Sequence, residues 1–98
     1  MTNYSTTTLT LTVPQDIEIT QSEAVYVTIK QGNCELIHKL VDSVEGRTVT
    51  VTLDQNETAK FEEGQASLML NIVYANGVRI PTREKTVRIY ENLHKAVI

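Results

Sequence analysis

A period-two alternation of apolar and polar residues runs through most of this 98-residue chain and limits its fold more than any other feature. In residues 8–13, TLTLTV, leucine and valine alternate with threonine. This spacing sends one set of side chains to each face of a β-strand, and β-branched threonine suits the exposed face. Similar alternation recurs in residues 24–31, 34–41, 47–53, 65–75 and 78–90. The pattern predicts an all-β protein of about six to seven strands.

Turn residues separate these segments. Gly32-Asn33 suits a type II′ turn and Asn76-Gly77 a type I′ turn, which would make two hairpins. The gaps are too short for parallel strands, whose crossovers need a dozen or more residues. We therefore expect an antiparallel β-sandwich of immunoglobulin-like topology, with a small closed barrel as the alternative. Its length fits one domain, 1–98, with 1–5 and 92–98 as flexible or partner-bound tails.

The turns also predict register. A two-residue loop at Gly32-Asn33 would place Val27 opposite His38, with His38 and Leu40 facing the core. The second hairpin would place Val73 opposite Ile80 and Ala66 opposite Val87. The expected core residues are Leu9, Leu11, Val13, Val25, Val27, Ile29, Leu36, His38, Leu40, Val49, Val51, Leu53, Ala66, Leu68, Leu70, Val87 and Ile89.

This register leaves a second set of apolar residues on the wrong face for the core. Contiguous apolar patches on a protein surface usually mark contacts with other molecules. The alternative is that the terminal segments cover these residues within one molecule. The predicted protein interface, including two tail residues, consists of Tyr26, Ile37, Val41, Val73, Val78, Ile80, Leu93 and Val97.

Charge and composition exclude several partners. The net charge is −3, with both signs interspersed, which argues against nucleic acid as a partner. No segment approaches the roughly 20 apolar residues of a membrane span, and the N-terminus lacks the pattern of a signal peptide. The single cysteine, Cys34, allows no intrachain disulfide. We expect no membrane partner and a location inside a cell or on a particle assembled there.

Residues with recognisable chemistry are scarce. A zinc site would need Cys34, His38 and His94 together with recruited carboxylates, so an inert thiol and a structural histidine are favoured. The chain contains neither a GxSxG nucleophile elbow nor a glycine-rich phosphate loop. The prediction is a non-enzymatic protein with no catalytic residues, cofactor or metal.

A short helical segment interrupts the strands at about residues 55–62. Asp54 and Glu57 have the spacing of a capping box, and Gly64 would end the helix as a C-cap. Phe61, the only phenylalanine, would then close one end of the core. The alternative is an acidic site, but the segment lacks the ligand spacing and central glycine of an EF-hand loop.

Residues 49–80, VTVTLDQNETAKFEEGQASLMLNIVYANGVRI, resemble a pattern in small proteins of phages and prophages of Gram-positive bacteria. Its centre is the turn Leu53-Asp54-Gln55-Asn56-Glu57-Thr58, and Val13-Pro14 fits the end of the opening strand. Similar domains lie at the N-termini of upper-baseplate proteins of siphophage tails and resemble immunoglobulin-like sandwiches.

The resemblance implies a role and no site. It implies a structural protein of a phage or prophage tail or baseplate, assembled in the bacterial cytoplasm and bound to other particle proteins or to itself. The alternative function is a stand-alone immunoglobulin-like module that binds a carbohydrate or host-surface ligand. Such a module would favour an aromatic platform, yet the chain has no tryptophan and its four tyrosines are dispersed.

Overall fold

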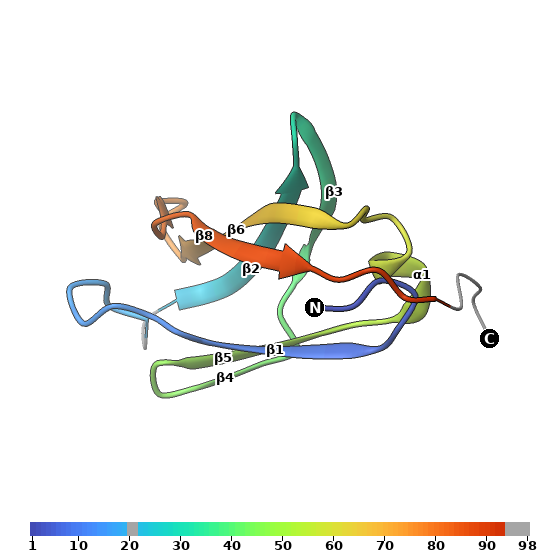
Figure 1. Ribbon diagram of the computed structural model, residues 1–98. Coiled ribbons are helices and arrows are strands. Elements are labelled where there is room, and N and C mark those ends of the chain that lie inside the picture. The colour runs from blue at the N-terminus through green and yellow to red at the C-terminus, as the bar shows by residue number, and fades with distance from the viewer. Residues whose placement is uncertain (20–21, 94–98) are drawn as a thin grey trace.

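A computed structural model describes residues 1–19 and 22–93. It contains eight strands and one helical turn, α1, which lies between β5 and β6 (Figure 1). Their bounds are β1 Thr7–Thr12, β2 Ser22–Gln31, β3 Cys34–Leu40, β4 Ser43–Glu45, β5 Thr48–Leu53, α1 Gln55–Thr58, β6 Gly64–Tyr74, β7 Arg79–Pro81 and β8 Lys85–Ile89.

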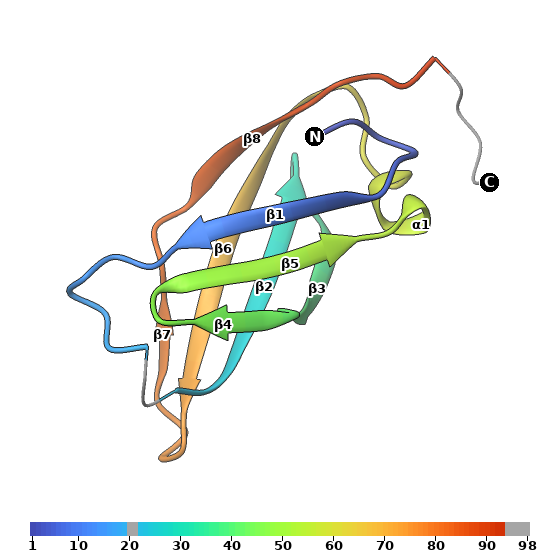
Figure 2. The same ribbon diagram turned by 90° about the horizontal axis from the view of Figure 1, so that it is seen from below.

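The strands form two packed antiparallel sheets. The smaller sheet has the order β1-β5-β4, and the larger has β3-β2-β6-β7, with β8 also paired to β6. Figure 2 shows the strands of the small sheet crossing those of the large one. This arrangement confirms the predicted all-β sandwich with one short helix. Two short strands, β4 and β7, raise the number above the predicted six to seven.

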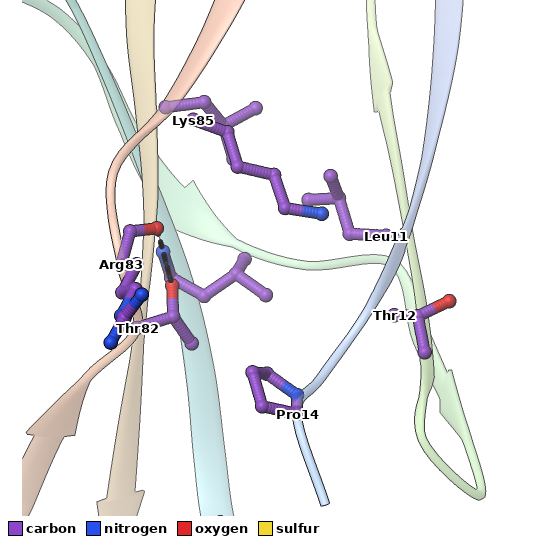
Figure 3. A pocket seen from close by; sticks show the side chains of 8 residues that line it. Leu11, Thr12, Pro14, Thr82, Arg83 and Lys85 are labelled. Atoms are coloured by element: carbon purple, nitrogen blue, oxygen red, sulfur yellow. Dashed lines mark hydrogen bonds between the residues drawn. The ribbon is translucent and has the colours of Figure 1, made fainter.

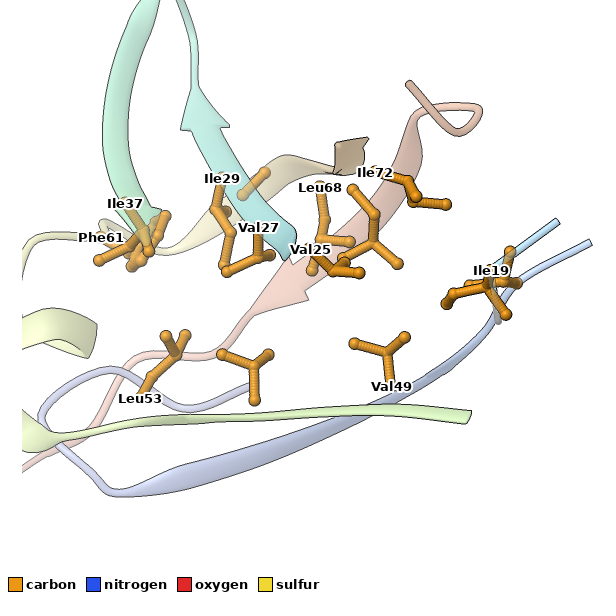
Figure 4. Packing of buried hydrophobic residues seen from close by; sticks show 14 of the residues in the cluster. Ile19, Val25, Val27, Ile29, Ile37, Val49, Leu53, Phe61, Leu68 and Ile72 are labelled. Carbon is orange, nitrogen blue, oxygen red and sulfur yellow. The ribbon is translucent and has the colours of Figure 1, made fainter. Parts of the chain in front are cut away.

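The core lies between the two sheets (Figure 4). Most of the alternation-based prediction is confirmed: Val25, Val27 and Ile29 of β2 are buried, as are the inward residues of β5 and β6. Leu9 and Leu11 are half-buried against this cluster. In the described part of the chain, every buried side-chain nitrogen or oxygen has a hydrogen-bond partner.

The β2–β3 hairpin departs from the predicted register. Gln31 pairs with Cys34 as expected, and Gly32 has a φ of +63°, as a type II′ turn requires. A β-bulge at Leu36 then shifts the pairing, so that Ile29 lies opposite Ile37 and Thr28 opposite His38.

The shift exchanges the two faces of β3. Ile37 is buried in the core, whereas His38 and Leu40 are exposed, so the prediction was wrong for all three. The exchange removes the need to bury the polar His38. It also directs Lys39 toward the second layer, where its Nζ donates to the Thr52 carbonyl at 2.7 Å and to Glu57 Oε1 at 2.9 Å.

The second hairpin differs by one residue at its turn. The Tyr74 amide donates to the Val78 carbonyl, so the loop has three residues, and of these only Gly77 has a positive φ. A type I′ turn would need positive φ at Asn76 as well, and that prediction was wrong. Ile80 therefore lies opposite Ile72 and not opposite Val73. The break between β7 and β8 restores the expected pairing of Ala66 with Val87.

The capping box at α1 is present. The Glu57 amide donates to Asp54 Oδ1 at 2.8 Å, and the Asp54 amide donates to Glu57 Oε1 at 3.0 Å. The helix ends at Thr58 with Ala59 as its C-cap, so Gly64 is not the cap and instead opens β6. Phe61 is buried, as expected of a residue that closes the core.

Residues 1–5, expected as a tail, are held against the domain. The Asn3 amide donates to the Tyr90 carbonyl, and Thr2 forms a parallel bridge with Tyr90. The hydroxyl of the buried Thr58 donates to the Ser5 carbonyl at 2.6 Å, and the Ser5 amide donates to that hydroxyl at 2.9 Å. These bonds tie the N-terminal segment to α1.

Replacing Asp54 with alanine is expected to lower the free energy of unfolding by about 1 kcal/mol, because the Glu57 amide loses its acceptor. Urea denaturation followed by circular dichroism measures this difference. Asn56→Ala is the control, because Asn56 is exposed on the same helical turn. Equal effects of the two substitutions would contradict a capping role.

Candidate functional site

The outer face of the large sheet, which is turned away from the small sheet, carries the most distinctive surface of the domain (upper side in Figure 1). Cross-strand pairing arranges its residues in rows. One row contains Leu40, Tyr26, Asn71 and Pro81, and the next contains His38, Thr28 and Met69. Apolar side chains predominate in the first row, whereas the second row is more polar.

One half of this face, called here the apolar half, consists of Ala24, Tyr26, Leu40, Val73 and Pro81. Leu40 is 54% exposed, and Tyr26 and Val73 are half-buried. Leu40 and Pro81 are both exposed, so neither is covered by another described part of the chain. Exposure of a large aliphatic side chain beside an aromatic ring is typical of a contact surface.

The other half, called here the polar half, surrounds a hollow of about 320 Å³. Thr28 and Lys30 of β2 and Ser67 and Met69 of β6 lie along it. The residues that complete its lining are Glu35, His38, Asn71, Arg79 and Glu84.

Tyr26 and His38 join the two halves. Their rings are stacked, with centroids 5.5 Å apart and planes 3° from parallel. His38 Nδ1 also lies 2.9 Å from Thr28 Oγ1 and 4.0 Å from Glu35 Oε1. These contacts fix the imidazole beside the hollow, so His38 has a positioned surface role and not the predicted core role.

The predicted interface residues do not form one patch. Tyr26 and Val73 lie on the outer face, but Ile37 is in the core and Val41 is half-buried against it. Val78 and Ile80 line a separate hollow with Tyr74 at the end of the sheet. Leu93 is 98% exposed, and Val97 lies outside the described residues.

Leu40 is the surface residue that sequence reasoning missed. It was assigned to the core because its parity matches Val25 in a regular hairpin. The available signal was His38: a regular register would have placed this polar ring in the core and the Lys39 charge on the outer face, and a bulge reverses both. Sequence periodicity cannot locate such a bulge, because one inserted residue leaves the alternation on either side unchanged.

A further opening lies between β1 and β8, at the open side of the sandwich. It encloses about 50 Å³ between Leu11, Pro14 and Leu70, and the amino end of Lys85 extends toward Leu11 (Figure 3). This space is small and largely apolar, and the Lys85 side chain lies across it. It is a packing gap at the sheet edges and a weaker candidate site than the outer face.

Within residues 1–19 and 22–93, no three histidine, cysteine, aspartate or glutamate side chains are grouped as metal ligands. Likewise, no helix in the described part of the chain is long and apolar enough to cross a membrane. In comparisons with known proteins, no family model and no curated protein matches this chain.

Proposed function

We propose that this chain is a non-enzymatic structural protein of a phage or prophage particle, associated with the tail or baseplate. It acts by binding other particle proteins or further copies of itself. The motif at Leu53–Thr58 and its order within the chain support the particle assignment through the resemblance described above. The apolar half of the outer face supports the mode of action.

The observation that carries the proposal is the exposure of the apolar half, which includes Tyr26. In a monomer, the side chains of Leu40, Val73 and Pro81 would be left in contact with water. A standard interface buries about 800 Å² on each partner, and its binding energy is concentrated in a few central aromatic and aliphatic groups. Tyr26 and Leu40, which lie opposite each other, would provide that centre.

Replacing Leu40 with lysine should weaken association about tenfold or more while leaving the fold intact, because Leu40 is exposed in the isolated domain. Size-exclusion chromatography with light scattering measures the mass of the purified chain over a concentration series. Association driven by apolar burial should change little with salt concentration.

Thr8→Lys is the matched control, because Thr8 is exposed on the opposite sheet. Association in particles is tested separately, by mass spectrometry of purified particles from an induced host. A wild-type chain that remains monomeric and is absent from those particles would refute the proposed function. If Thr8→Lys weakened association as much as Leu40→Lys does, the apolar half would not be the surface through which the chain associates.

A further inference from the structure

We propose that the hollow in the polar half of the outer face binds a neutral saccharide. The hollow shares no lining residue with the apolar half, although Asn71 lies between Tyr26 and Pro81 and Arg79 lies opposite Val73. The saccharide proposal does not depend on the proposed assembly role. Its lining combines hydroxyl, amide, guanidinium and carboxylate groups over the apolar side chain of Met69. Its volume, about 320 Å³, is at the lower end of the range of roughly 300–1,000 Å³ that small-molecule sites occupy.

Five of the polar side chains that line this hollow are not used by the fold. Among the described residues, Lys30, Ser67, Asn71, Arg79 and Glu84 make no side-chain hydrogen bond or ion pair with one another or with any other residue. This contrasts with the buried polar groups of the domain, which all have partners. The hollow therefore presents several uncommitted donors and acceptors in one place.

The balance of charge favours a neutral ligand. Lys30 lies directly opposite Glu35 across the β2–β3 hairpin, and Arg79 and Glu84 both lie on the β7–β8 side. An anion would meet two carboxylates, and a cation would meet two basic groups. The two basic and two acidic groups cancel, so the lining as a whole carries no net charge that would select an anion or a cation.

The hydrogen-bonding groups match sugar hydroxyls. A hydroxyl both donates and accepts, as do the Asn71 amide and the Ser67 hydroxyl, while Arg79 only donates and Glu84, when ionised, only accepts. Vicinal hydroxyls can therefore bond to adjacent groups of either kind. Met69 and the His38 ring, which is stacked on Tyr26, supply apolar surface for the C–H face of a sugar ring.

The test is a titration of the isotope-labelled full chain, followed by amide chemical shifts in two-dimensional NMR. The probes are glucose, galactose, rhamnose and N-acetylglucosamine, with inorganic phosphate and glycine betaine as charged and zwitterionic comparisons. We expect at least one sugar to bind with a Kd on the order of 1 mM, as suits a ligand of one ring. The shifts should be concentrated at residues 28–38, 67–71 and 79–84.

Two variants and one control make the assignment specific. Arg79→Ala and Asn71→Ala should each weaken binding about tenfold, while Thr8→Ala on the opposite sheet should leave it unchanged. Arg79 is exposed, so its loss is not expected to disturb folding, and the dispersion of the amide spectrum verifies this.

Sugar-induced shifts at the hollow, together with a Kd that each variant raises about tenfold, would support the proposal. Three results would overturn it: no response to any of the four sugars, a larger response to phosphate or betaine, or sugar shifts unchanged by Arg79→Ala. None of these results bears on the association measured with Leu40→Lys, so the two proposals fail independently.

Discussion

Replacing Ile37 with glutamate should prevent the chain from folding. Ile37 is 3% exposed, and its side chain lies in the core between the sheets (Figure 4). Burying an unpaired carboxylate costs roughly 4–5 kcal/mol or more. That is a large part of the total stability of about 5–15 kcal/mol expected for a domain of this size. Circular dichroism and NMR amide dispersion of the purified variant measure the loss.

Leu40→Glu is the matched control, because Leu40 lies on the same strand but on its opposite, exposed face. It should retain the native spectrum and change the free energy of unfolding by at most about 1 kcal/mol. In a regular hairpin without the bulge the two outcomes would be exchanged. A folded Ile37→Glu together with an unfolded Leu40→Glu would therefore contradict the observed register.

Replacing Phe61 with alanine should lower the free energy of unfolding by about 3–5 kcal/mol. Phe61 is 2% exposed and lies at the end of the core nearest α1. Removing its ring leaves a cavity that the capped turn cannot easily fill, because Asn3 Nδ2 donates to the Phe61 carbonyl at 3.1 Å and holds the backbone in place. Urea denaturation curves with unchanged slope would give the difference.

Two comparisons separate the ring from the turn that carries it. Phe61→Leu retains most of the apolar volume and should cost less than Phe61→Ala. Asp54→Ala disrupts the cap but leaves the ring in place, and should cost about 1 kcal/mol. If Phe61→Ala costs no more than Asp54→Ala, Phe61 does not close the core as described.

The proposed assembly surface and the proposed saccharide hollow share one sheet face but use different residues. Leu40 and Val73 belong to the apolar half, while Arg79 and Ser67 line the hollow. Tyr26 connects them through its stack on His38. A partner that covered the apolar half would thus lie beside the hollow, and Leu40→Lys and Arg79→Ala distinguish the two functions experimentally.

The sequence by itself determined the features that depend on near neighbours along the chain. Alternation placed the inward residues of β2, β5 and β6 correctly, because a strand sends successive side chains to opposite faces. The capping box was predictable because both bonds that join Asp54 to Glu57 lie within one turn. The type II′ turn at Gly32 was predictable because glycine accepts positive φ at little cost.

Only the tertiary structure decided which side of β3 faces the core. A bulge and a regular ladder have similar local sequences, and the choice depends on whether Ile37 or His38 enters the space between the sheets. Burial of Ile37 and the bonds from Lys39 to Thr52 and Glu57 favour the bulge, and all of these contacts join segments distant in sequence.

The candidate site could not be predicted from the sequence, because it too depends on contacts between segments distant in sequence. The hollow and the apolar half both depend on the register of β3 against β2 and of β7 against β6, and each register differs by one residue from its prediction. A shift of one residue turns a side chain to the opposite face of a sheet, so a small error in pairing moves whole residues between core and surface. Packing between the two layers fixes that register.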